Sequence, residues 1–547
     1  MSFKNKVVYQ IYPKSFYDSN NDGIGDLKGI TKKLKYLNFL GIDYIWITPF
    51  FVSPQRDNGY DVADYYNIDP LYGTMEDLDE LILEASKYGI KLMLDMVFNH
   101  TSTEHIWFKQ AIQGNKKYQN YYFFKKSIDN KLPTNWVSKF GGNTWEYCKE
   151  LDMYYLHLFD KTQADLNWEN PEVRKEMTKI VNFWINKGIE GFRFDVVNLI
   201  SKPQIFKDDF IGDGRRFYTD GPNIHSYLKE LNKNSFGKLK NIVTVGEMSS
   251  TTIENCYKYS GEKENELSMV FSFHHLKIDY KNKNKWELQE ADFEELKEIL
   301  NTWQLGMQKN NAWNALFWCN HDQPRIVSRL GDDKIYWKKS AKMLATMIHC
   351  LRGTPYIYQG EEIGMTNTYF ETINDFKDIE SLNYYDIFLK EGKSPEEALK
   401  IIQERSRDNG RTPMQWNNKN FGGFSNIIPW INPIKNFKQI NVENQINDCD
   451  SILHYYKKLI QLRKNYLPIS EGEFIPVITE KDIYIYKRKY NSEEILVILN
   501  YKNKKEITLP KEEIEKNYSC ILSNNNIIKL TSKLTLEPFD TFVFYKK

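Results

Sequence analysis

The sequence predicts an α/β protein built on a (β/α)₈ barrel, with an all-β domain at its C-terminal end. Three observations support this prediction. Short apolar stretches alternate with segments of helical periodicity from residue 7 to about 466, a pattern typical of a parallel sheet covered by helices. The apolar stretches number eight, and β-strand patterns replace the helical periodicity after about residue 467. At 547 residues the chain is also too long for one ordinary core, so we expect more than one domain.

The eight predicted strands are short segments rich in β-branched and aromatic residues. In chain order they are Val7–Ile11, Ile42–Ile47, Ile90–Phe98, Gly191–Val196, Ile242–Gly246, Met269–Phe273, Ala315–Cys319 and Tyr356–Tyr358. In a barrel of this type the C-terminal ends of all strands meet at one mouth, where catalysis takes place. Side chains that follow these strands are therefore the first candidates for a functional site.

The segments between the strands carry the signals that begin and end helices. Gly41 follows an apolar helical repeat and acts as a stop signal. Thr74 and Asp77 form the pattern of a capping box. Asn170 precedes Pro171, a proline suited to the first position of a helix. These signals predict helices that cover the outside of the barrel.

Two regions depart from this alternation. Residues 101–168 are rich in aromatic residues and glycine, and the stretch is too long for an ordinary loop, so we predict an inserted subdomain after the third strand. The barrel itself is then expected in residues 1–100 and 169–466. Residues 467–547 contain alternating apolar segments typical of an antiparallel β-sandwich domain. These segments are Ile483–Tyr486, Ile495–Leu499 and Thr541–Tyr545.

Composition excludes several classes of protein. The 74 basic residues are balanced by 73 acidic ones, so the excess of positive charge typical of nucleic-acid binding is missing. No apolar run approaches the length of a membrane span, and a strand pattern begins too early for a signal peptide. Six widely spaced cysteines favour reduced thiols over disulfides or a zinc site. We expect a cytoplasmic protein with no nucleic-acid or membrane partner and no organic or redox cofactor.

Charged and polar side chains recur at the ends of the predicted strands. In Gly191–Asp195, alternation places Arg193 and Asp195 on the same face. Buried charges need partners, so Arg193 should keep Asp195 ionised and oriented. Other strands end in Asn99-His100, Glu247 and Asn320-His321-Asp322. Carboxylates and histidines at one mouth indicate acid–base chemistry on a neutral, hydroxyl-rich substrate, with a satisfied salt bridge as the alternative for any single acid.

These strand ends resemble the motifs of the α-amylase family of glycoside hydrolases. The matching segments are Asp95–His100, Gly191–Asp195, Gly246-Glu247 and Asn320–Asp322. Three further segments are similar to the oligo-1,6-glucosidase branch of that family: Asn58–Asp61, Gln163–Trp168 and Arg411–Trp416. The resemblance covers nearly the whole chain and implies a barrel, an inserted subdomain and a C-terminal β domain.

The resemblance also implies a retaining mechanism and a role for each site residue. Asp195 would be the nucleophile, Glu247 the general acid and then base, and Asp322 the carboxylate that grips and distorts the reacting sugar. A retaining enzyme needs two carboxyl groups about 5–5.5 Å apart. Asp61 and Arg411 match the pair that closes the pocket and limits cleavage to single glucosyl units. Positions that match hydroxyl-binding or ring-stacking residues are His100, Phe140, Phe159, Arg193 and His321.

Further segments are similar to the branch of the family that hydrolyses trehalose 6-phosphate. This similarity implies a small phosphorylated disaccharide as substrate and glucose and glucose 6-phosphate as products. Hydrolysis of isomalto-oligosaccharides is the alternative, and sucrose-converting transglycosylases share the same motifs. We expect Lys277, beside His274, to select the phosphate as a compact point charge; the alternative is a solvated loop lysine. The segments are Pro133–Trp136, Lys139–Asn143, Gly212–Gly221, Gly246–Thr252 and Phe271–Lys277.

The segment from 18 to 26 carries oxygen ligands at alternate positions. With glycine at the turn, it resembles calcium-binding loops. We expect a structural Ca²⁺ here, with Mg²⁺ as the alternative ion and a metal-free Asx-rich turn as the alternative structure. The candidate ligands are Asp18, Asn20, Asp22, Ile24 and Asp26.

Overall fold

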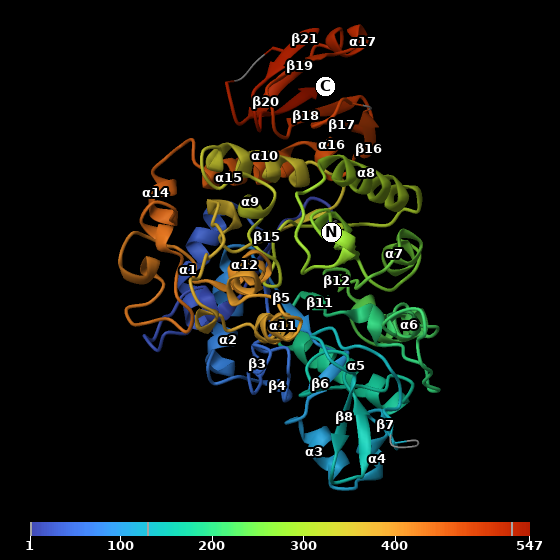
Figure 1. Cartoon of the computed structure of the whole chain (residues 1–547). Helices are drawn as coiled ribbons and strands as arrows, with labels where there is room; N and C mark the ends of the chain where they lie inside the picture. The colour runs from blue at the N-terminus through green and yellow to red at the C-terminus, as the bar shows by residue number, and fades with distance from the viewer. Residues whose placement is uncertain (1–2, 128–130, 478, 527–528) are drawn as a thin grey trace.

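The computed structural model describes residues 3–127, 131–477, 479–526 and 529–547. Its centre is a sheet of eight parallel strands in the order β13-β12-β11-β5-β2-β1-β15-β14 (Figure 1). The strands are β1 (Val8–Ile11), β2 (Tyr44–Ile47), β5 (Lys91–Met96), β11 (Gly191–Phe194), β12 (Val243–Glu247), β13 (Met269–Phe271), β14 (Ala315–Leu316) and β15 (Thr354–Tyr358). Each corresponds to one of the eight strands predicted from the sequence.

The two ends of this sheet meet. A parallel bridge joins Val270 in β13 to Asn314, the residue before β14. The sheet therefore curls into a nearly closed barrel, and the predicted fold class is confirmed. In barrels of this type the functional groups gather where the strands end.

Helices surround the barrel, and the predicted cap residues begin and end them. Thr74 and Asp77 form both bonds of a capping box at the start of α2. Asn170 accepts a hydrogen bond from the Glu172 amide at the start of α5. Gly41 ends α1 with a φ of 93°, a conformation that glycine adopts without strain. The main helices are α1 (Leu27–Leu40), α2 (Met75–Lys87), α5 (Pro171–Asn186), α6 (Ile224–Asn234), α7 (Ile253–Ser260), α8 (Phe293–Lys309), α10 (Trp337–His349) and α15 (Ile452–Asn465).

The segment between β5 and α5 forms a small antiparallel unit at one end of the molecule (Figure 1). Strands β7, β9 and β8 make one sheet, and β10 pairs with β6 next to the barrel. Trp136 and Trp145 pack here with Tyr218, which belongs to the loop after β11. The elements are β6 (His100–Ser102), α3 (Ile106–Ile112), α4 (Lys116–Gln119), β7 (Phe124–Lys125), β8 (Trp145–Cys148), β9 (Met153–Leu156) and β10 (Gln163–Asp165).

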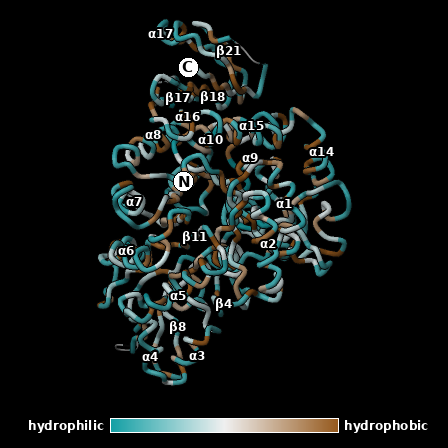
Figure 2. The backbone as a smooth tube through the Cα atoms, turned by 180° about the vertical axis from the view of Figure 1, so that it is seen from behind, coloured by the Kyte–Doolittle hydropathy of each residue, from teal (hydrophilic) through white to brown (hydrophobic). Residues whose placement is uncertain are grey.

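The C-terminal residues form two antiparallel sheets that share a core, as predicted. Ile485 and Leu496 of the larger sheet pack against Ile507 and Leu534 of the smaller one. Figure 2 shows this domain stacked on barrel helices α8, α10 and α15. The larger sheet contains β16 (Glu473–Val477), β17 (Ile483–Tyr490), β18 (Glu493–Asn500), β22 (Thr541–Lys546) and β20 (Ser519–Ser523), and the smaller β19 (Lys505–Thr508) and β21 (Lys533–Leu536).

Two shorter helices after β15 matter for the site described below. They are α11 (Ile379–Lys390) and α12 (Pro395–Arg405), which pack against each other and lie in front of the barrel strands in the view of Figure 1. In the part of the chain that the structure describes, no helix combines the length and the apolar character needed to cross a bilayer.

Candidate active site

A single buried arginine, Arg193 in β11, contacts three carboxylates at the C-terminal end of the barrel. Its Nη1 donates to Oδ1 of Asp95 and to Oδ1 of Asp195, each at 2.6 Å. Its Nη2 contacts Oε2 of Glu247. Strand β11 lies between β5 and β12, and the register places Arg193 directly beside Asp95. One guanidinium group therefore holds Asp195 and Glu247 close to each other, and Asp95 is a member of the site that sequence reasoning did not single out.

Burial and ion pairing act on Asp195 in opposite directions. Removal from water raises the pKa of its carboxyl group and Arg193 lowers it, which leaves the pKa at about 6. Asp195 is therefore mostly ionised at neutral pH, as a carboxylate nucleophile must be.

Asp322 is ionised and open to the pocket. Its side chain is 34% exposed, and it lies 2.9 Å from Nη2 of Arg411 and 3.4 Å from Nη1 of Arg407. Burial alone would raise the pKa of Asp322, but the positive charges of Arg407, Arg411 and Arg193 outweigh burial and hold the pKa well below its usual range. The carboxylate is thus available to accept hydrogen bonds from sugar hydroxyls.

The two predicted histidines both lie at the mouth and are neutral. Burial lowers the pKa of His100 and lowers that of His321 to about 3. His321 stacks on Tyr60 at 4.9 Å between ring centroids. Gln10 donates to its Nδ1, so the proton lies on Nε2, which points toward Asp322 at 3.4 Å. A neutral imidazole can bind a hydroxyl group without adding charge to the site.

The predicted aromatic residues form a continuous wall beside these histidines. Phe159 lies 5.3 Å from His100 and 5.6 Å from Phe140, measured between ring centroids. The guanidinium of Arg407 lies over the Phe140 ring at 4.9 Å. Phe140 and Phe159 therefore come together with the catalytic residues, although they belong to the inserted unit.

Asp61 and Arg411, the residues predicted to close the pocket together, bind other partners in the structure. Asp61 is fully buried and accepts hydrogen bonds from Ser53 Oγ and from the amides of Arg56 and Asp57. These bonds occupy Asp61 in shaping its own loop. Arg411 is also buried and donates to the His321 carbonyl and to Asp322.

The ion pair at the pocket joins Asp57 to Arg407 instead. Oδ1 of Asp57 lies 3.2 Å from Nη2 of Arg407, and both side chains are buried. Each residue stands four positions before the predicted one, in Asp57-Asn-Gly-Tyr-Asp61 and Arg407-Asp-Asn-Gly-Arg411. Each motif contains two residues of the required type, four positions apart. The sequence therefore indicated the motif but could not show which of its two residues forms the ion pair.

Comparison with known proteins identifies the family to which this chain belongs. Residues 10–472 match the family model of the alpha-amylase catalytic domain. The chain belongs to the α-amylase family. It is 50% identical to a trehalose-6-phosphate hydrolase of Bacillus subtilis (strain 168), over 99% of this chain and 98% of that protein. It is 45% identical to an oligo-1,6-glucosidase of Bacillus cereus, over 100% of this chain and 99% of that protein.

A solved structure supports the same family assignment. The crystal structure of Bacillus licheniformis trehalose-6-phosphate hydrolase superposes on this α-amylase-family chain with a TM-score of 0.95 and 52% sequence identity, covering 100% of both chains. Both the barrel and the peripheral units therefore follow a known arrangement.

The loop after β13 contains both Lys277 and His274, but only Lys277 lies at the active site of this α-amylase-family protein. Lys277 lines the same pocket as Glu247 and Asp322, and burial lowers its pKa. Among the described residues it has no acidic partner within salt-bridge distance. His274 instead packs on Trp303 in α8, with ring centroids 4.9 Å apart. The contacts of His274 thus place it behind the pocket wall and not in it.

The predicted metal loop is a tight turn held by its own carboxylates. Asp18 accepts hydrogen bonds from the Asn21 and Gly23 amides at 2.7 and 2.9 Å, and Asp26 accepts from the Ser19 amide at 2.8 Å. The oxygen-rich composition fits a hard cation. However, the described residues contain no group of three or more His, Cys, Asp or Glu side chains placed to hold a metal. A cation here would therefore depend on amide and carbonyl oxygens, such as those of Asn20 and Ile24.

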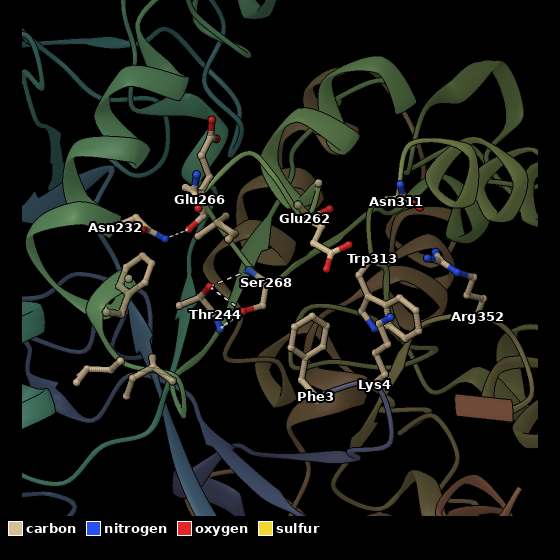
Figure 3. A pocket seen from close by; sticks show the side chains of 18 residues that line it. Phe3, Lys4, Asn232, Thr244, Glu262, Glu266, Ser268, Asn311, Trp313 and Arg352 are labelled. Atoms are coloured by element: carbon tan, nitrogen blue, oxygen red, sulfur yellow. Dashed lines mark hydrogen bonds between the residues drawn. The ribbon is translucent and has the colours of Figure 1, made fainter. Parts of the chain in front are cut away.

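A separate cavity of about 340 Å³ lies at the opposite end of the barrel. Its lining includes Phe3 and Lys4 before β1, Asn311 and Trp313 before β14, and Arg352 before β15 (Figure 3). These residues precede the strands, whereas catalytic groups in such barrels follow them. The cavity is therefore distinct from the active site.

Proposed function

We propose that this protein is a retaining, exo-acting α-glucosidase that hydrolyses trehalose 6-phosphate to glucose and glucose 6-phosphate. The observation that carries this proposal is the position of Lys277, a cation without an acidic partner among the described residues, in the pocket that contains Glu247 and Asp322. A relative with this activity in its name, 50% identical over almost the whole chain, supports it.

The chemistry follows from the carboxylates that Arg193 holds. Asp195 attacks the anomeric carbon of the glucosyl unit, and Glu247 protonates the oxygen that leaves with glucose 6-phosphate. Glu247 then acts as a base and takes a proton from the water that hydrolyses the covalent intermediate. Arg193 contacts both carboxylates, and this supports the short spacing that a retaining mechanism needs.

The shape of the pocket supports removal of one glucosyl unit at a time. Asp57 and Arg407 form a buried ion pair, and Arg407 also reaches Asp322. We infer that this buried ion pair closes that side of the pocket to a longer chain. Hydroxyl groups of a terminal glucose can bind to Asp322, His100 and His321, while Phe140 and Phe159 supply an apolar wall.

The alternative substrate is a neutral isomalto-oligosaccharide, which the 45% identical oligo-1,6-glucosidase makes reasonable. The two substrates differ in charge beyond the scissile bond, and a sugar phosphate requires cationic partners there. A lysine meets this requirement because its ammonium group is a compact charge that can bind a phosphate without a fixed bidentate geometry. A small phosphorylated disaccharide is therefore the proposed partner, and a cytoplasmic location remains a prediction.

The proposal is tested by comparing trehalose 6-phosphate, trehalose, isomaltose and sucrose as substrates at equal concentrations. We expect trehalose 6-phosphate to give the highest kcat/KM and glucose 6-phosphate to appear as a product. Preference for isomaltose would favour the alternative. Formation of a sucrose isomer would instead identify a transglycosylase.

We also propose that a structural Ca²⁺ binds the loop from Asp18 to Asp26. The oxygen-bearing residues of the turn support this proposal. Asp26 accepts a hydrogen bond from the Gly29 amide in α1, and Asp18 accepts one from Ser425 Oγ, so both carboxylates anchor the loop. A cation that binds only the folded protein stabilises it by mass action.

Exhaustive chelation should therefore lower the melting temperature, and added Ca²⁺ should restore it. The measurement is a thermal melt before and after chelation, with Mg²⁺ added in parallel to compare the two ions. A second test is Asp22→Asn, which removes the exposed carboxylate of one candidate ligand and should weaken the restoring effect of Ca²⁺. An unchanged melting curve after chelation, together with no metal detected by elemental analysis, would exclude this proposal.

A further inference from the structure

Asp378 is a buried carboxylate that the mechanism has not yet used. It is the residue before α11, and its exposed fraction is 0%. Its Oδ1 accepts a hydrogen bond from Nε of Arg407 at 2.8 Å and lies 2.6 Å from Nη2 of the same guanidinium. The carboxylate thus binds one whole edge of Arg407.

The same carboxylate also begins helix α11. It accepts hydrogen bonds from the amides of Glu380 and Ser381 and from Ser381 Oγ, the last at 2.6 Å. Its own amide donates to Asp408, the residue next to Arg407. Asp378 is therefore fixed on both sides, by the helix and by the segment that carries Arg407.

Helix capping alone does not require a charge at this position. An N-cap needs only a side-chain oxygen that accepts a backbone hydrogen bond, and Ser394 and Asn170 serve α12 and α5 in this way. A buried ion pair contributes little net stability, because both charges must leave water. The presence of a carboxylate at Asp378 therefore points to its second contact, the one with Arg407.

The geometry of a guanidinium explains what this contact does. Its five donors lie in one plane in a fixed fork, so binding one edge sets the direction of the others. With Nε and Nη2 held by Asp378, Nη1 is directed toward Asp322 at 3.4 Å and Nη2 also reaches Asp57 at 3.2 Å. Glu380 lies farther from Nε, at 3.6 Å.

We propose that Asp378 is a positioning residue that aims Arg407 across the mouth, from Asp57 to Asp322, and so closes the glucosyl pocket. This inference rests on the proposed function only in taking that pocket as the glucosyl subsite. The glucosyl unit is common to all the substrates considered. Replacement of Asp378 should therefore lower kcat/KM whether or not the substrate carries a phosphate.

The first test is Asp378→Asn, which keeps the size of the side chain and an oxygen for the helix cap. We expect kcat/KM to fall at least fivefold, by the same factor for trehalose 6-phosphate and for a neutral aryl α-glucoside. The matched control is Ser381→Ala, which removes a hydrogen bond to the same carboxylate but leaves its charge; its kcat/KM should stay within twofold. Equal small effects of both substitutions would overturn the proposal.

The second test asks whether Asp378 acts through Arg407. In Arg407→Lys the fork is lost, so adding Asp378→Asn should change kcat/KM by less than twofold, because the effects of residues in one network are not additive. A purely structural role would give the full loss again in this background and would refute the positioning role. If Asp378→Asn does not fold, Asp378→Ser retains a strong N-cap and takes its place in both tests.

These outcomes remain separate from those of the proposed function. If the unmodified protein fails to cleave trehalose 6-phosphate, the proposed substrate is wrong. The aryl α-glucoside measurements then still decide whether Asp378 positions Arg407.

Discussion

Replacement of Asp195 by asparagine should remove several orders of magnitude of turnover and leave the fold intact. The amide has nearly the same shape and can still accept a hydrogen bond from Arg193, whose Nη1 lies 2.6 Å from Oδ1. It cannot form the covalent glycosyl intermediate on which a retaining mechanism depends. The measurement is kcat on an aryl α-glucoside, with the circular dichroism spectrum and melting temperature as controls for folding.

The identity of the nucleophile can also be tested directly. A fluorinated glucoside that slows hydrolysis of the intermediate should label the protein covalently, and peptide mapping should place the label on Asp195. NMR of the first product should show retention of the anomeric configuration. A label on another residue, or inversion at the anomeric carbon, would contradict the assignment.

Replacement of Lys277 by alanine should raise KM for trehalose 6-phosphate at least tenfold and hardly change cleavage of a neutral aryl glucoside. A charge-assisted hydrogen bond at a partly desolvated site contributes roughly 1.5–3 kcal/mol, which corresponds to about 10- to 150-fold in affinity. Lys277 lines the pocket with Glu247 and Asp322, so its ammonium group is placed to bind the leaving-group phosphate.

The matched control is Lys281→Ala, which removes the same charge from an exposed lysine of the same loop. It should leave both KM values within twofold. Equal losses on both substrates for Lys277→Ala, or no loss on either, would remove Lys277 from the phosphate site. Lys285 would then be the next candidate, although it is already ion-paired with Glu380 at 2.6 Å.

Much of the fold could be predicted from sequence because its signals are local. Each strand of the barrel is a short apolar run, and cap residues such as Thr74 and Gly41 mark helix ends independently of the rest of the chain. Alternation along β11 also fixed that Arg193 and Asp195 share a face. These features follow from backbone geometry and hydrophobic periodicity, which a single sequence displays directly.

The contacts between elements could not be predicted in the same way. The pairing of Arg193 with Asp95 and Glu247 depends on β11 lying between β5 and β12. Nothing within one strand determines its neighbours. The inserted unit likewise contributes Phe140 and Phe159 to the site only because it folds back over the barrel mouth.

The sequence by itself thus determined the barrel, the acids at its strand ends and the residue types of the pocket. Only the tertiary structure decided which residue of each repeated type forms the ion pair beside Asp322: Asp57 and not Asp61, and Arg407 and not Arg411. The physical reason is that side-chain direction in an irregular loop is set by distant partners. For Arg407 that partner is Asp378 at the start of α11, a contact that no local pattern encodes.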